Sequence, residues 1–100
     1  MVAVEMPARF RCDATFTIPV RRYFVLRGQI IYGIVHPGMR AIIPTPSGGE
    51  LIRTIASIEV LSTGDKQGAV GLCLRCEDDS ELTGLQRMGI HDVICSVTEE

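Results

Sequence analysis

The sequence predicts an all-β fold, a small antiparallel Greek-key barrel, closed or partly open, of about six to seven strands. Apolar and polar residues alternate with a period of two, as in strands with one buried face. Turn signals rich in Gly and Pro recur roughly every 8–12 residues, and no long amphipathic helix interrupts them. The chain has 100 residues, 46% of them hydrophobic, which is enough for one core. We therefore expect a single domain, with a flexible N-terminal segment at 1–9 and the barrel at 10–97.

The first half of the chain predicts four extended runs. The first covers residues 10–18, where Phe10, Cys12, Ala14, Phe16 and Ile18 alternate with polar residues. Proline cannot donate to a central ladder, so the proline at position 19 ends or bends this strand. Residues 22–26 and 28–35 can form one long bent strand. A turn at 36–38 then leads to a short strand at 39–43.

The second half begins with the clearest loop, residues 44–49, which contain two Pro and two Gly. Strands are predicted at 51–61, 69–76 and 91–97, with a turn at 63–68. Residues 77–80 form an acidic N-cap that leads into one helical turn at 81–85. We expect the interior to be filled by side chains such as Phe16, Ile31, Ile58 and Leu72. Residues 10–18 are the candidate edge strand, so we expect a monomer or a weak homodimer.

Four cysteines are present, and two of them, Cys73 and Cys76, have the CxxC spacing of half a zinc site or of a redox pair. Residues three apart on a strand point to opposite faces, so these two sulfurs should not converge on one ion. Without a readable secretory signal we expect a cytoplasmic, reducing environment and structural thiols. The alternative is a small thiol- or zinc-dependent protein that uses Cys73, Cys76, Cys95 and His91.

Catalytic motifs are missing from the sequence. There is no phosphate-binding Gly-x-x-x-x-Gly-Lys-Ser/Thr loop and no Gly-x-Ser-x-Gly nucleophile motif. His36 belongs to a turn, and His91 precedes Asp92 in an expected strand, where neighbouring side chains point in opposite directions. We therefore expect no enzymatic activity, no cofactor and no metal.

Charge is divided unevenly along the chain, although its net value is only -2. Residues 1–53 hold seven arginines against three acidic residues, and residues 54–100 hold three basic residues against nine acidic ones. A single barrel brings both halves together, so we expect the signs to mix on its surface. Arg21, Arg22 and Arg27 are the candidates for contact with an anionic partner. The low isoelectric point and the few aromatic residues argue against general nucleic-acid binding.

Residues 27–38 read Arg-Gly-Gln-Ile-Ile-Tyr-Gly-Ile-Val-His-Pro-Gly. This stretch resembles the signature of the second, β-barrel domain of translation GTPases such as elongation factor Tu. Gly28 and Gly33 fit that pattern because glycine permits sharp curvature and close backbone approach at barrel corners, and Gly38 permits a turn. Residues 51–61, 69–75 and 85–97 resemble the later strands of the same domain. The resemblance covers residues 20–97.

This resemblance implies a binding function without the family's GTPase chemistry, because the chain has no GTPase domain. In the family, the barrel helps to contact the acceptor end of aminoacyl-tRNA, the ribosome and the neighbouring GTPase domain. The sequence departs from the family in a shortened segment after Gly33 and in Cys76, where the family often has Gly. We expect a non-catalytic binding module whose partner is protein or RNA. The longest apolar run is far shorter than the ~20 residues of a membrane helix, so no membrane association is expected.

Overall fold

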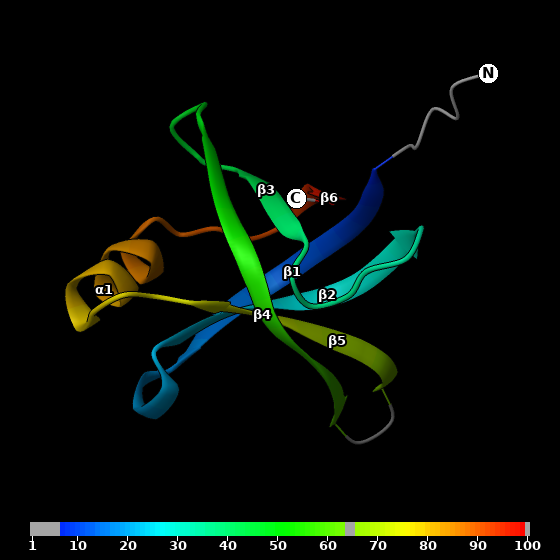
Figure 1. The fold of residues 1–100 in the computed structure, drawn as a ribbon, viewed down its shortest axis with the longest axis horizontal. Helices are drawn as coiled ribbons and strands as arrows, with labels where there is room; N and C mark the ends of the chain where they lie inside the picture. The colour runs from blue at the N-terminus through cyan, green and yellow to red at the C-terminus, as the bar shows by residue number, and fades with distance from the viewer. Residues whose placement is uncertain (1–6, 64–65, 100) are drawn as a thin grey trace.

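The computed structural model describes residues 7–63 and 66–99, and within residues 62–67 it describes no side chains. Six antiparallel strands close into a barrel in the order β1-β2-β5-β4-β3-β6 (Figure 1). In chain order the elements are β1 (Ala8–Ile18), the 3-10 turn η1 (Pro19–Arg21), β2 (Tyr23–Tyr32), β3 (Arg40–Pro44), β4 (Glu50–Thr63), β5 (Lys66–Arg75), α1 (Asp79–Arg87) and β6 (Val93–Thr98). The predicted all-β barrel is confirmed.

The strand order contains two overlapping Greek keys. β3, β4 and β5 follow one another as paired neighbours. β2 lies beside β5, and β6 lies beside β3, so each completes a four-strand Greek key with the same three strands. β1 closes the ring because it pairs with both β2 and β6.

The core fills the inside of the barrel with apolar side chains from every strand. Phe10, Phe24, Leu26, Leu72 and Leu74 are all 0% exposed. Each such burial contributes ~1.5–3 kcal/mol, so these residues dominate the stability of the barrel. No polar or charged side chain is buried in the part of the chain that the structure describes.

A bulge in β1 moves its later apolar residues to the outside of the barrel. Cys12 pairs with Gly28 and Ala14 with Arg27, so Asp13 is an extra residue that reverses the alternation. Phe16 therefore lies on the outer face, 37% exposed, and not in the interior as predicted. The outer face carries its own small cluster, in which Ile18 packs against Tyr23, Val25 and Cys73.

Of the other residues expected inside the barrel, two are buried at least in part and one is exposed. Leu72 is 0% exposed, and Ile58 is partly buried against the main core. Ile31 is 49% exposed, so its predicted interior position is wrong. The register explains it: Arg9 pairs with Tyr32 and Phe10 with Ile30, which leaves Ile31 as an extra residue on β2.

Glycine allows β1 and β2 to cross closely at the first bulge. A Cβ atom on Gly28 would lie 1.7 Å from the carbonyl oxygen of Arg11, so no side chain fits there. β2 consequently runs without a break from Tyr23 to Tyr32, as one bent strand. Gly33 ends it at φ 89°, and Gly38 forms the next turn at φ 96°, both in the left-handed region.

β1 begins earlier than predicted and is paired on both sides over its first half. Ala8 is 4% exposed and pairs with Val97, so residues 8 and 9 belong to the barrel and not to a flexible segment. Residues 1–6 of that predicted segment lie outside the described residues. Residues 9–12 pair with both β2 and β6, so this half of β1 is not the free edge proposed for a homodimer.

α1 is longer than the single helical turn predicted from the sequence. It covers Asp79–Arg87, and Asp78 caps it by accepting a hydrogen bond from the Glu81 backbone N–H at 2.8 Å. Leu82 and Leu85 are 6% and 4% exposed and belong to the main core, so α1 covers one end of the barrel. No helix in the described part of the chain has the length and apolar character needed to cross a membrane.

Candidate functional site

The turn between β1 and β2 fixes two of the three arginines that the sequence singled out. Arg21 ends η1, and Arg22 follows it with a left-handed backbone at φ 55°. The Arg22 N–H donates to the Pro19 carbonyl at 3.1 Å, and the Arg22 carbonyl accepts from the Cys76 N–H at 2.8 Å. The turn is therefore held against the end of β5.

A surface depression of about 640 Å³ lies beside this turn. Arg21, Arg22 and Arg75 line it, together with the acidic residues Glu77 and Asp79. Arg27 lies outside the depression, five positions further along β2, a separation of ~16 Å at the usual rise per residue of a strand. The structure thus brings Arg21 and Arg22 together but not Arg27.

Arg75 was not singled out from the sequence, although it lines the same depression as Arg21 and Arg22. It pairs with Tyr23 in the β2–β5 ladder, and its guanidinium lies 5.8 Å from the centroid of the Tyr23 ring. This contact holds the guanidinium by a cation–π interaction at the barrel surface. The alternation of residues in β5 is a signal in the sequence that Arg75 points outward. Only the pairing of β5 with β2 shows that it lies beside Arg22.

A second depression, of about 720 Å³, continues from Arg75 toward α1. Arg53, Arg75, Glu77 and Glu81 line it. The Arg53 Nε donates to Glu81 Oε1 at 3.0 Å, and Glu81 Oε2 accepts from the Glu77 N–H at 3.2 Å. Glu81 is therefore held on both sides, and it fixes the guanidinium of Arg53 in turn.

The link between Arg22 and α1 is looser than the link between Arg53 and Glu81. Arg22 Nε lies 3.6 Å from Asp79 Oδ1, with side chains 53% and 82% exposed. Arg22 Nη1 also donates to the Glu77 carbonyl at 3.3 Å. Exposed pairs of this kind contribute ~0–1 kcal/mol, so Asp79 holds the Arg22 guanidinium only weakly. We call the surface of Arg21, Arg22, Arg53 and Arg75 the arginine surface.

The residues of the alternative zinc or thiol site lie in different places. Cys73 belongs to the outer cluster, Cys76 and Cys95 belong to the main core, and His91 is exposed. All four cysteines are free and buried. Within residues 7–63 and 66–99, no three His, Cys, Asp or Glu side chains gather where they could hold a metal ion.

Burial also controls the acidity of the thiols. Desolvation raises the pKa of Cys12 to about 11 and that of Cys95 to about 12. It raises the pKa values of Cys73 and Cys76 as well. Because the thiolate is the reactive form, the raised pKa values disfavour reaction of these thiols at neutral pH.

The two histidines each contact a carboxylate at the surface. His91 Nδ1 lies 3.3 Å from Asp92 Oδ2, so the prediction that these side chains point apart is wrong. The last strand starts only at Val93, and Asp92 has a left-handed backbone at φ 50°, which turns its side chain toward His91. His36 Nε2 lies 2.8 Å from Glu99 Oε1, and its Nδ1 lies 3.0 Å from the Pro37 carbonyl.

Comparison of the chain with family models, curated proteins and solved structures gave no match in any of the three.

Proposed function

We propose that the chain is a non-catalytic binding module built on a translation-factor-like barrel. The observation that carries this proposal is the filled interior: the described core is apolar throughout, with no buried polar or charged side chain. A catalytic group acts together with a positioned polar partner, and a core of apolar side chains supplies no such groups. Binding at the outer surface is therefore the function that this geometry favours.

The glycine geometry supports the resemblance to the second domain of translation GTPases. Gly28 stands where β1 and β2 approach too closely for a side chain, and Gly33 and Gly38 have positive φ angles at the two following turns. These are the three glycine positions of the family pattern within residues 27–38. The closed six-strand barrel is compatible with such a domain.

The arginine surface is the proposed contact for an anionic partner, protein or RNA. Arginine presents a planar fork that binds carboxylate and phosphate groups in two-point contacts. Arg75 is stacked on Tyr23, whereas Arg22 makes an exposed pair with Asp79 and a long hydrogen bond with the Glu77 carbonyl. Arg21 and Arg22 are therefore the residues whose loss should weaken binding most.

The test is a polarisation titration at low salt with labelled tRNA and with labelled single-stranded RNA. If the partner is RNA, the double variant Arg21→Gln/Arg22→Gln should bind more weakly. The slope of the logarithm of its binding constant against the logarithm of the salt concentration should fall in magnitude by about one for each lost phosphate contact. Arg87→Gln, an exposed arginine in the last turn of α1, is the matched control. Absence of binding to both RNAs removes the RNA version and leaves a protein partner. Equal weakening by the control variant would refute the arginine surface.

A further inference from the structure

The second half of β1 is an edge of the sheet that no other strand covers in the described part of the chain. Pairing of β1 with β6 ends where Cys12 faces Val93. Residues 14–18 pair with β2 alone, in a register without a break. Within residues 7–63 and 66–99, no turn, loop or cap forms a backbone hydrogen bond with residues 14–18. Alternate N–H and C=O groups of this segment therefore point away from β2 without a ladder partner. We call residues 14–18 the free edge.

The free edge lacks the charged side chains with which sheet edges are usually protected. It reads Ala-Thr-Phe-Thr-Ile. Natural proteins block such edges with charges, prolines and bulges. Here the bulge at Asp13 comes before the free edge, and Pro19 comes after it. Threonine, phenylalanine and isoleucine favour extended backbone, and Phe16 is 37% exposed. The segment itself is therefore open to a further strand.

A second copy of the same segment is complementary to this edge in the antiparallel direction. A two-fold axis at Phe16 places this residue opposite its own copy. Thr15 then lies opposite Thr17 of the other copy. Ala14 and Ile18 form the outermost pair. Aromatic pairs and threonine pairs are favourable across neighbouring strands, and no like charges meet along the five positions.

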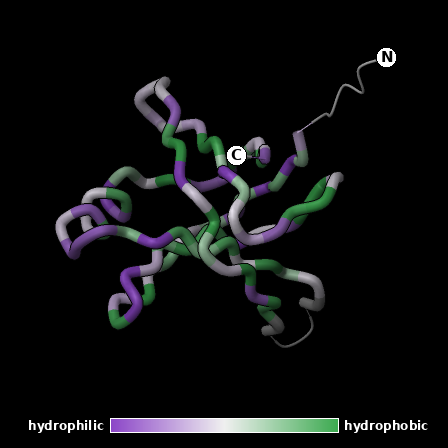
Figure 2. The backbone as a smooth tube through the Cα atoms, viewed as in Figure 1, coloured by the Kyte–Doolittle hydropathy of each residue, from purple (hydrophilic) through white to green (hydrophobic). Residues whose placement is uncertain are grey.

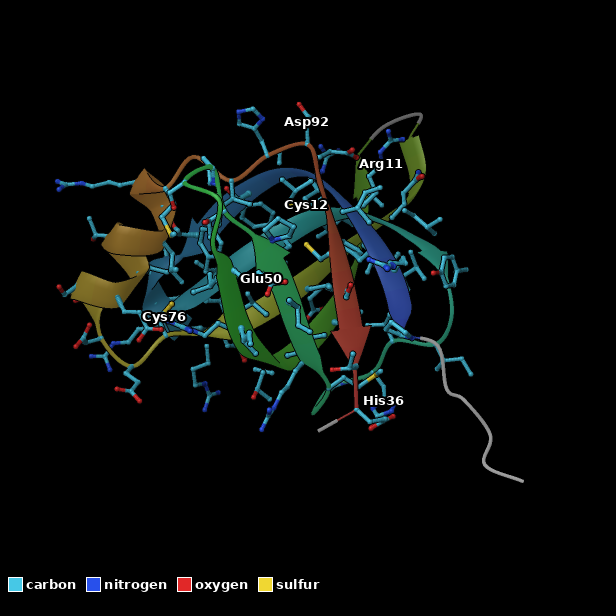
Figure 3. All side chains as sticks on the ribbon, turned by 90° about the horizontal axis from the view of Figure 1, so that it is seen from above. Arg11, Cys12, His36, Glu50, Cys76 and Asp92 are labelled. Atoms are coloured by element: carbon cyan, nitrogen blue, oxygen red, sulfur yellow. The ribbon has the colours of Figure 1, made fainter. Side chains whose placement is uncertain are left out.

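The two ends of the free edge carry opposite charges. Asp13 precedes it, and Asp92 lies just before β6, whose first residue pairs with Cys12. Figure 3 shows Asp92 and Cys12 at the same end of β6. Arg21 and Arg22 follow the free edge at the η1 turn, which Figure 2 shows as a projection with hydrophobic and hydrophilic residues. Antiparallel pairing sets the basic turn of one copy beside the acidic end of the other, and the symmetry repeats this contact.

The length of the free edge limits the pairing to five residues. β6 already occupies the edge of β1 beside residues 9–12, so an incoming strand cannot extend there and Arg11 stays outside the pairing. The incoming strand ends at Pro19, which cannot donate to a ladder. The contact is therefore small, and small interfaces give weak, concentration-dependent association.

We propose that the free edge binds the free edge of a second copy of this chain, antiparallel about a two-fold axis at Phe16, in a weak homodimer. A strand of another protein could use the same backbone groups, but the free edge matches itself. Its centre is uncharged and its two ends have opposite signs, which is the pattern that a two-fold axis requires. This inference goes beyond the proposed function and does not depend on RNA binding.

Sedimentation velocity at protein concentrations up to about 1 mM tests the homodimer, because weak interfaces need high concentration. The unaltered chain should change from monomer to dimer as the concentration rises. Phe16→Lys and Phe16→Glu each bring like charges together at the axis, so each should weaken the dimer about tenfold or more. An equimolar mixture of the two variants should associate again, because each charge then faces its opposite.

Matched variants separate the free edge from general association. Val60→Lys places the same charge on β4, at a side chain that is 79% exposed, and should leave the dimer unchanged. Asp13→Asn changes an exposed side chain and removes one charge from each acidic end, so it should weaken the dimer roughly threefold. Circular dichroism of each variant checks that it is folded.

Three results would each overturn the proposal. The first is a chain that stays monomeric over the whole concentration range. The second is a loss of association in Val60→Lys as large as that in Phe16→Lys. The third is a mixture of the Phe16→Lys and Phe16→Glu proteins that associates no better than either protein alone. Both Phe16 variants keep Arg21 and Arg22, so the RNA titration and the dimer test can fail independently.

Discussion

Gly28 is the residue on which the crossing of β1 and β2 depends most directly. A methyl group there would collide with the Arg11 backbone carbonyl, and both strands would have to move. We expect Gly28→Ala to lower the free energy of unfolding by about 2 kcal/mol or more, as for overpacked sites. Urea denaturation of the purified variant measures this loss.

Gly84 provides the matched control for that substitution. It lies inside α1, and a Cβ atom there would meet nothing within 4 Å. Because alanine is a better helix former, Gly84→Ala should raise the free energy of unfolding by ~0.5–1 kcal/mol. A Gly28→Ala protein as stable as the wild type would show that the two backbones do not approach so closely.

His36 should titrate at a higher pH than an ordinary histidine. Its hydrogen bond to the Pro37 carbonyl, then that to Glu99, raises its pKa above the usual 6.5. A raised pKa means that the imidazolium is favoured in the folded state. The resulting stabilisation is present below pH 6.5 and is lost as the pH rises through the higher value.

The His36 titration can be followed through its ring proton resonances by NMR. In Glu99→Gln the pKa should fall toward the ordinary value, because the charged acceptor is lost. A His36 pKa that is the same in both proteins would contradict the contact with Glu99.

At the scale of single residues, the sequence shows which side chains can bind an anion, but not which of them lie together in the folded chain. Arg21 and Arg22 lie together because they are adjacent in one turn, and local sequence is sufficient for that. Arg75 joins them only through the β2–β5 register, in which it faces Tyr23. Long-range pairing of this kind leaves no signal in a single sequence.

Among the elements, α1 offers the clearest test because one side chain caps it. Asp78→Ala should lower the free energy of unfolding by ~1 kcal/mol, because the Glu81 N–H loses its acceptor. Asp78→Asn should cost little, since asparagine caps nearly as well. Urea denaturation of both variants makes the comparison. A similar loss in both would mean that the charge of Asp78, and not its hydrogen bond, supports α1.

In β1, the alternation of apolar residues correctly predicts a strand, but it predicts the wrong face of the sheet for the second half of that strand. Phe10 and Phe16 belong to one unbroken alternating run in the sequence, yet the extra residue Asp13 reverses the direction of everything after it. Both faces of β1 carry apolar residues here, because Ile18 packs in the outer cluster. A strand with two apolar faces gives no sequence signal for where a bulge lies.

For the whole molecule, the closed barrel should protect every thiol. We expect none of the four cysteines to react with a thiol reagent at neutral pH until the protein unfolds, because all are buried and their pKa values are raised. Counting reactive thiols with and without urea checks this. Rapid reaction of Cys73 or Cys76 in the native protein would favour the thiol-dependent alternative.

The overall architecture could be predicted because turn positions and the period of two are local features of the sequence. The number of strands, the acidic N-cap and the glycine turns all followed from them. Closure of the barrel over Ala8–Cys12 and a surface groove beside Ile34 did not, because both arise where segments distant in sequence meet. Length and composition therefore restrict the possible classes of function, and only the packing shows which residues share a surface.

The central claim is that this barrel acts through its outer surface and not through its interior. The most direct measurement is a map of backbone amide and methyl resonances during titration with tRNA and with single-stranded RNA. We predict shifts near Arg21 and Arg22, while the interior methyl groups of Leu26 and Leu72 stay unchanged. Shifts centred on those interior methyl groups would contradict the account.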